Sequence, residues 1–217
     1  IEAMAGTGVV TVAAEAGAST VVTFTNGLNN VSKTVTGTGA AQAVQLTSAE
    51  LTTLGDGSIS VSATATDAAG NASSAGTTSF TLDTVAPTTP TLTLGTGVSN
   101  GATTTEATAA TGAVSVTAEA GATTVVTFTN GINTVSKTVT GNGSTPVAVE
   151  LSSAELTTLG DGTIGVSATA TDAAGNASSA GTSSFTLDTN APSAVTGIIL
   201  TPSGGTVVAN TLNSTNT

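Results

Sequence analysis

One long segment of this chain occurs twice in the sequence. Residues 21–37 (VVTFTNGLNNVSKTVTG) return 104 positions later as residues 125–141 (VVTFTNGINTVSKTVTG). After one inserted residue near Pro146 the offset becomes 105, and of the 41 positions that align 47–87 with 152–192, five differ and 36 are identical. A repeat of this length is far too long for one solenoid turn and corresponds to one small domain. The chain is therefore expected to fold as consecutive domains of one type.

The motif Asp-Thr-x-Ala-Pro is expected to mark the domain boundaries. A strand pattern precedes it, and its proline restricts the backbone where the chain leaves the domain. It occurs at 83–87 and at 188–192. The expected domains are residues 1–87, 88–192 and 193–217. The middle domain is a complete repeat, and the first is a copy without the opening strand, TLTLGTGVSNG in the complete repeat. The last residues are expected to begin a third, divergent domain.

Within the complete repeat, apolar residues alternate with Ser and Thr, a pattern typical of half-buried antiparallel strands. The expected strands are 90–95, 112–119, 123–129, 134–140, 146–151, 163–171 and 182–188. A helical turn is expected at 152–155, where Ser152 and Glu155 have capping-box spacing. Seven short strands in about 100 residues predict an immunoglobulin-like (Ig-like) sandwich. The predicted fold class is all-β, with tandem seven-stranded Ig-like β-sandwiches joined by short linkers.

The composition excludes several classes of function. Cys and His are absent, so no disulfide, thiol or imidazole chemistry and no ordinary zinc site can form. Lys33 and Lys137 are the only basic residues against 13 acidic ones, so we expect no nucleic-acid partner. No apolar run approaches the roughly 18 residues of a membrane span. A hydroxyl nucleophile would lack a histidine base, and no aromatic platform for a sugar exists, so we expect no enzyme.

Both lysines lie in phase with neighbouring valines. The favoured interpretation is a lysine on an edge strand, with its stem on apolar surface and its ammonium group in water. The alternative is an isopeptide crosslink to an Asn or Asp side chain.

The combination GDGxIxVSATATDAAGNxS followed by FTLDTxAP resembles the tandem Ig-like repeats of giant bacterial surface adhesins. These are the biofilm-associated and RTX-type proteins exported by type I secretion, and the resemblance covers nearly all of residues 1–192. It implies an extracellular stalk on the bacterial cell surface, often stiffened by calcium at the domain junctions. Such a stalk projects a distal binding region for cell adhesion or biofilm formation.

The strand order of a sandwich predicts a group of oxygen ligands at the junction. The second-to-third and sixth-to-seventh strand loops share one end of the sandwich, and in the complete repeat they carry Glu119, Asp172 and Asn176. Asp83 ends the last strand of the preceding repeat and reaches the same end. Calcium binds about 6–8 oxygens of these types, and no Lys or Arg is near to relieve the repulsion among the acids. We therefore expect a calcium ion between these four residues.

The first repeat and the far junction carry equivalent groups. They are Glu15, Asp67 and Asn71 in the first repeat, Asp188 for the next domain, and, less favoured as ligands, Asp56 and Asp161 in the GDG turns at the opposite end. The alternative interpretation is that DAAGN and GDG are ordinary turns, in which Asp and Asn cap backbone groups and Gly adopts positive φ.

The expected function is therefore that of structural stalk repeats in a secreted adhesin, with neighbouring Ig-like domains of the same chain as partners. Two alternatives stay open. One is a subunit of a surface layer or filament, which predicts lateral self-association. The other is a set of Ig-like repeats that themselves bind a glycan or a host protein.

Overall fold

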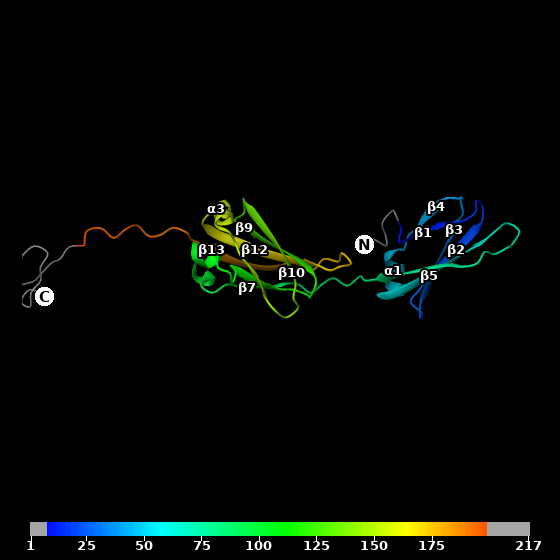
Figure 1. Cartoon of the computed structure of the whole chain (residues 1–217), viewed down its shortest axis with the longest axis horizontal. Helices are drawn as coiled ribbons and strands as arrows, with labels where there is room; N and C mark the ends of the chain where they lie inside the picture. Colours follow the sequence, from blue (N-terminus) through cyan, green and yellow to red (C-terminus); the bar gives the residue numbers. More distant parts are fainter. Residues whose placement is uncertain (1–7, 199–217) are drawn as a thin grey trace, which may run out of the picture.

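The computed structural model describes residues 8–198, which form two β-sandwiches placed end to end along the long axis of the molecule (Figure 1). The second sandwich contains a four-stranded sheet of order β10-β9-β12-β13 and a three-stranded sheet of order β11-β8-β7. Its strands are β7 (Thr91–Leu94), β8 (Val114–Thr117), β9 (Thr123–Thr129), β10 (Thr134–Thr140), β11 (Val147–Val149), β12 (Gly162–Thr171) and β13 (Gly181–Leu187). All seven predicted strands are present and pair antiparallel, so the all-β sandwich prediction is confirmed.

The core of the second sandwich lies between its two sheets and consists of the inward residues of each strand. Val126 and Phe128 on β9 and Ile164 on β12 are fully buried, while the Ser and Thr between them face outward or are half-buried. This is the alternation expected from a period of two. Burying a Val, Ile or Phe side chain stabilises the fold by about 1.5–3 kcal/mol each, so the core rests on many medium-sized contributions.

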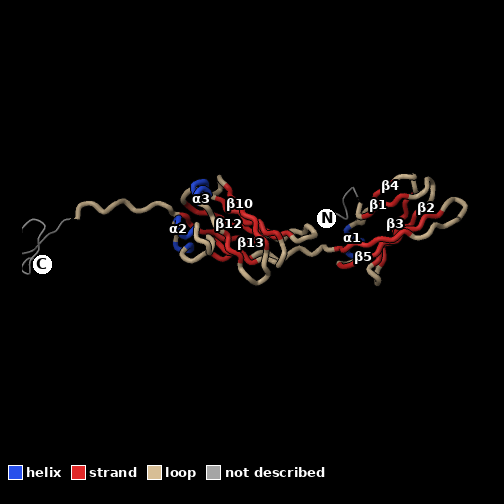
Figure 2. Tube along the Cα trace, viewed as in Figure 1, coloured by secondary structure: helices blue, strands red, loops and turns tan. Residues whose placement is uncertain are grey.

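The first sandwich contains a four-stranded sheet of order β3-β2-β5-β6 and a two-stranded sheet of β1 and β4 (Figure 2). Its strands are β1 (Val10–Ala13), β2 (Ser19–Thr25), β3 (Asn30–Thr36), β4 (Ala41–Val44), β5 (Gly57–Thr66) and β6 (Gly76–Leu82). In residues 8–198, β1 pairs only with β4, whereas its counterpart β8 pairs with both β11 and β7. The domain boundaries stay a prediction, and most of the expected third domain lies outside the described residues.

Two short helices occupy the same position in the two repeats, α1 (Ser48–Leu54) and α3 (Ser153–Leu159). The predicted helical turn is confirmed and continues to Leu159. The Glu155 N–H donates to Ser152 Oγ at 3.3 Å and the Ser152 N–H donates to Glu155 Oε2 at 2.7 Å, so the capping box is complete.

The sequence reasoning missed the capping box of α1, formed by Thr47 and Glu50, and a third capping box in the segment before β8. The third box opens α2 (Thr104–Ala107), where the Thr103 N–H donates to Glu106 Oε2 at 2.9 Å, and it follows the short 3-10 helix η2 (Val98–Asn100). The signal was the Thr-x-x-Glu spacing at 103–106. Among residues 8–198, none of the helices is long and apolar enough to cross a membrane.

Candidate functional site at the junction between the sandwiches

The junction begins at the GDG turn of the first sandwich, which holds the start of the linker. Asp56 Oδ1 accepts hydrogen bonds from the Thr84 N–H at 2.8 Å and from the Thr84 hydroxyl at 2.9 Å. The second repeat has the same arrangement, in which Asp161 Oδ1 accepts from the N–H and hydroxyl of Thr189 at 2.9 and 2.8 Å. The GDG motif and the Asp-Thr motif, 28 positions apart, are thus two halves of one contact that fixes how the chain leaves a sandwich.

The far end of the linker packs on the second sandwich. Pro87 and Pro90 are buried, and the Pro90 carbonyl lies directly over Gly181 at the start of β13. A Cβ atom at Gly181 would approach the Pro90 oxygen to 1.9 Å, so only glycine fits there. The chain then enters β7 at Thr91. Both ends of the linker are therefore held by specific contacts.

The DAAGN turn between β12 and β13 makes a hydrogen bond across the junction. Asp172 Oδ1 accepts from the Asn176 N–H at 2.8 Å, and Asp172 Oδ2 accepts from the Asn176 Nδ2 group at 2.9 Å. The same Nδ2 group donates to the Asp83 backbone carbonyl at 3.1 Å. Asn176 thus closes its own turn and joins it to the end of the preceding sandwich.

These hydrogen bonds also set the ionisation of the turn aspartates. The side-chain hydrogen bond from Asn176 is the largest cause that holds the pKa of Asp172 below its usual range. In the first repeat, the bond from Asn71 lowers the pKa of Asp67 in the same way. Both carboxylates are therefore anionic hydrogen-bond acceptors at neutral pH.

The predicted ligand set is only partly brought together. Asp172, Asn176 and the backbone of Asp83 meet at the junction, while the Glu119 side chain is exposed. Within the described residues, no group of three or more His, Cys, Asp or Glu side chains is placed to hold a metal ion. The oxygen chemistry of the set suits calcium, but the Asn176 amide directs its N–H donors toward Asp172 and the Asp83 carbonyl, and an ion would need its oxygen there instead. The calcium site stays a prediction.

The other candidate ligands follow the alternative interpretation, in which turn residues cap backbone groups. Asp83 Oδ1 accepts from the Val85 N–H at 3.1 Å, and Asp188 Oδ1 accepts from the Asn190 N–H at 3.1 Å. Asp56 and Asp161 hold the linker as described above, Asp67 and Asn71 close their turn, and the Glu15 side chain is exposed.

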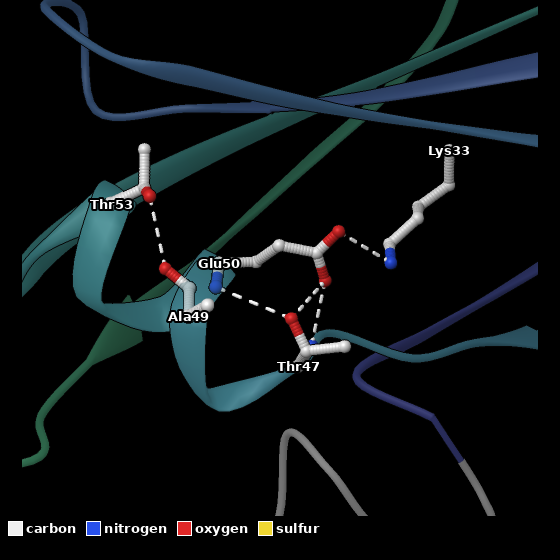
Figure 3. Close-up of polar contacts among 5 residues, drawn as sticks. All are labelled: Lys33, Thr47, Ala49, Glu50 and Thr53. Carbon is white, nitrogen blue, oxygen red and sulfur yellow. Dashed lines mark hydrogen bonds and ion pairs between the residues drawn. The ribbon is translucent and has the colours of Figure 1, made fainter.

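One polar contact escaped the sequence analysis and is present in both repeats. Lys33 on β3 forms an ion pair with Glu50 of α1, with Nζ and Oε1 2.6 Å apart (Figure 3). In the second repeat, Lys137 Nζ pairs with Glu155 Oε1 at 2.7 Å. Figure 3 shows that Glu50 contacts the lysine with one carboxylate oxygen and Thr47 with the other. The lysine is the largest cause that lowers the pKa of Glu50. The lysines do lie on edge strands, and their side chains, 27% and 30% exposed, also pair with the glutamates of the helix caps.

A shallow depression of about 560 Å³ lies on the outer face of β5 and β6 of the first sandwich. It is lined by Thr25, Ser60, Val61, Ser62, Thr77, Thr78 and Ser79. These side chains are hydroxyl-bearing or apolar and include no acid or base, so this lining offers no partner to activate a hydroxyl nucleophile.

The chain is similar to two solved structures from large adhesins, the class of protein that the repeated motifs resemble. One is the crystal structure of a tetra-tandem repeat in the extending region of a large adhesion protein, with 29% identity over 80% of this chain and 42% of that chain and a TM-score of 0.37. The other concerns host cell surface retention of a 1.5-MDa bacterial ice-binding adhesin, with 24% identity over 82% of this chain and 55% of that chain and a TM-score of 0.35.

The chain spans about half the length of these two solved chains. No family model and no curated protein matches it. At TM-scores this low, the function has to be argued from the chain's own residues.

Proposed function

We propose that these repeats are stalk segments of a secreted adhesin on the bacterial cell surface, which project a distal binding region for adhesion or biofilm formation. The role is taken from the resemblance of the repeated motifs, and its structural support comes from the linker. The observation that carries the proposal is that hydrogen bonds or close packing hold the linker at both ends.

A stalk must transmit orientation from one domain to the next, and the contacts of the linker do this in two steps. Asp56 fixes Thr84 to the first sandwich. Six residues further along the chain, Pro90 packs on Gly181 of the second sandwich. Pro87 lies between these two points, so φ is fixed at Pro87 and again at Pro90. Rotation in this segment is therefore more restricted than in an ordinary Gly- or Ser-rich linker.

The surface chemistry supports an extended, non-adherent rod. The formal net charge is −11, and the outward positions of the strands are mostly Ser and Thr. Stalks of equal charge that stand side by side on a cell repel each other. Domains without cysteine also suit export as an unfolded polypeptide, because their folding after export requires no disulfide bond.

Small-angle X-ray scattering of the full chain tests the rod. We expect a narrow distribution of separations between the two sandwiches. We expect the combined Asp56→Ala and Asn176→Ala variant to broaden this distribution. The matched control combines Asp161→Ala with Asn71→Ala, which removes the equivalent turn and linker contacts of Asp161 and Asn71 outside this junction and leaves the Asn176–Asp83 bond in place. A wild-type chain with an already broad distribution of separations would overturn the proposal.

Calcium at the junction is a separate part of the proposal. An ion there would neutralise the carboxylates of Asp83, Glu119 and Asp172, and the Asn176 amide would have to turn its oxygen toward the ion. We expect added calcium to raise the unfolding temperature and EGTA to reverse the rise, with Asp83→Asn and Glu119→Gln reducing it. Identical melting curves in calcium and EGTA would remove the ion from the proposal and leave the rod intact.

A further inference from the structure

Four asparagines of this chain precede a glycine, and the structure restrains their side chains to different degrees. They are Asn26, Asn100, Asn130 and Asn142. An Asn-Gly pair is chemically labile, because glycine has no side chain to keep its backbone nitrogen away from the asparagine carboxamide. The N–H group of each of the four glycines donates a hydrogen bond. The four sites therefore differ mainly in how the asparagine itself is held.

Asn26 and Asn130 are half-buried in the turns of the β2–β3 and β9–β10 hairpins. Asn130 Oδ1 accepts hydrogen bonds from the Ile132 N–H at 2.9 Å and from the Asn133 N–H at 2.7 Å. Its Nδ2 group donates to the Leu159 carbonyl at the end of α3. Asn26 forms the equivalent bonds in the first repeat. Neither carboxamide can rotate toward its glycine nitrogen until these bonds break.

Asn142 is exposed, and no residue in the range 8–198 forms a hydrogen bond with its side chain. Its backbone lies in the loop between β10 and β11. There the Gly143 N–H donates to the Ala118 carbonyl at 3.0 Å, and the Gly141 carbonyl accepts from the Gly121 N–H at 2.9 Å. The Asn142 carboxamide can therefore rotate toward the Gly143 nitrogen without breaking a side-chain contact.

The first repeat has the same loop with a threonine in place of the asparagine. Thr38 occupies the position of Asn142, and the Gly39 N–H donates to the Ala14 carbonyl at 2.9 Å. The loop forms this backbone contact with either residue. The fold therefore does not require an asparagine at position 142.

Asn100 is also exposed, but its backbone is part of η2. Its N–H donates to the Gly97 carbonyl at 3.2 Å, and the Gly101 N–H donates to the Val98 carbonyl at 3.4 Å. Val98 is 0% exposed, which fixes this turn to the core. We expect the reactivity of Asn100 to lie between that of Asn142 and that of the two hairpin asparagines.

We propose that Asn142 is a site of spontaneous covalent modification in the folded chain, and that the hydrogen-bonded turns protect Asn26 and Asn130. The Gly143 backbone nitrogen attacks the side-chain carbonyl carbon of Asn142 and closes a succinimide ring. The carboxamide nitrogen leaves as ammonia, together with the amide proton of Gly143. Water then opens the ring and leaves a carboxylate at position 142, as aspartate or isoaspartate.

The product changes the charge at one end of the second sandwich. The loop of Asn142 is bound to Ala118 and Gly121, on both sides of Glu119. The strand β9 begins at Thr123, which pairs with Thr171 of β12 just before the DAAGN turn. The new carboxylate therefore adds a negative charge beside Glu119, at the end of the sandwich that meets the linker.

Incubation of the folded full chain at mildly alkaline pH, followed by trypsin digestion and mass spectrometry, tests the proposal. Trypsin cleaves after Lys33 and Lys137, and the three fragments separate Asn26, Asn130 and Asn142 from one another. Each conversion adds about one dalton, and fragmentation in the spectrometer assigns it to a residue. We expect Asn142 to react at least about tenfold faster than Asn26 or Asn130, because each protected turn must first open.

Two variants and one condition complete the test. Asn142→Thr carries the residue of the first repeat and should abolish the reaction in this loop, whereas Thr38→Asn should create a reactive pair in the first repeat. Incubation in urea removes the folded turns and should make the rates at Asn26, Asn130 and Asn142 similar. Equal rates at these sites in the folded chain, or a difference of about tenfold that persists in urea, would overturn the proposal.

Discussion

Phe80 and Phe185 occupy the same position in two repeats of nearly the same sequence, yet Phe185 is 5% exposed and Phe80 is only partly buried. The difference comes from residues 90–102, which cover the edge of the second sandwich and have no counterpart in residues 8–198 of the first. Burial is thus a property of the neighbours as well as of the residue. The comparison predicts that the second sandwich is the more stable one, because it buries more apolar surface.

The largest expected effect comes from removing the central phenylalanine of each core. Phe24 and Phe128 are both 0% exposed, and truncation to alanine costs about 3–5 kcal/mol in such sites. We expect Phe24→Ala to unfold the first sandwich at 25 °C, while Phe128→Ala lowers the melting temperature of a second sandwich that stays folded. Calorimetry of the full chain resolves the two transitions. Equal melting temperatures of the two sandwiches in the wild type would show that residues 90–102 add no stability.

The second effect isolates the contact between linker and sandwich. Gly181→Ala places a methyl group against the Pro90 carbonyl and should destabilise the second sandwich by about 1–3 kcal/mol. The matched variant Gly76→Ala meets open space and should leave stability unchanged or raise it slightly. Denaturant unfolding of each variant measures the difference. A neutral Gly181→Ala would mean that the linker does not pack there.

The third effect should be equal in the two sandwiches. Glu50→Gln and Glu155→Gln each remove an ion pair and should each cost about 0.5–1 kcal/mol at low salt. The lysine partners hold the pKa of both glutamates below the usual range. The stabilisation of each sandwich by its ion pair is therefore complete above the unfolded-state glutamate pKa of about 4.3. It is lost as the pH falls through the lower folded-state pKa.

Melting curves between pH 7 and pH 3 measure this loss. Both transitions should shift downward in the wild type toward low pH, and each glutamine variant should flatten the pH dependence of its own sandwich. A flattening in only one sandwich would contradict the symmetry of the two ion pairs.

The smallest effect concerns the hydrogen bond across the junction. Asn176→Ala and Asn71→Ala both remove a turn cap, so each should raise the pKa of the neighbouring aspartate toward its usual value, measured by NMR titration of the carboxyl carbon. Only Asn176→Ala also removes the bond to Asp83, worth about 0.5–1.5 kcal/mol at most. NMR residual dipolar couplings should then show looser alignment of the two sandwiches, and unchanged couplings would show that this bond does not orient them.

The strands were predictable because each alternates apolar and polar residues over its own length. The strands β9 and β10 fall on the expected residues, and β12 differs from the expected range by one position. The α3 helix was predictable from Ser152 and Glu155, since a capping box is a contact between residues three apart. Interactions between residues close in the sequence were sufficient to predict these elements.

The contacts that sequence reasoning did not identify join residues far apart in the chain. Lys33 and Glu50 are 17 positions apart, and Asn176 and the Asp83 carbonyl are 93 positions apart. Strand order predicted that Asp172, Asn176 and Asp83 approach one end of the sandwich. It did not predict that the Asn176 amide donates to both aspartates, because this depends on side-chain rotation after the turn has closed.

The repeated sequence by itself determined that this chain forms two like β-sandwiches in series, because period-two alternation and turn residues act within a few positions of each other. Only the tertiary structure decided how far each edge residue is buried and how the linker is held. These properties depend on whether a distant segment covers an edge, as Pro90 covers Gly181, whereas no atom of residues 8–198 lies within 4 Å of a Cβ built at Gly76. Identical residues then differ in burial, because burial is set by the atoms that surround a side chain and not by the side chain itself.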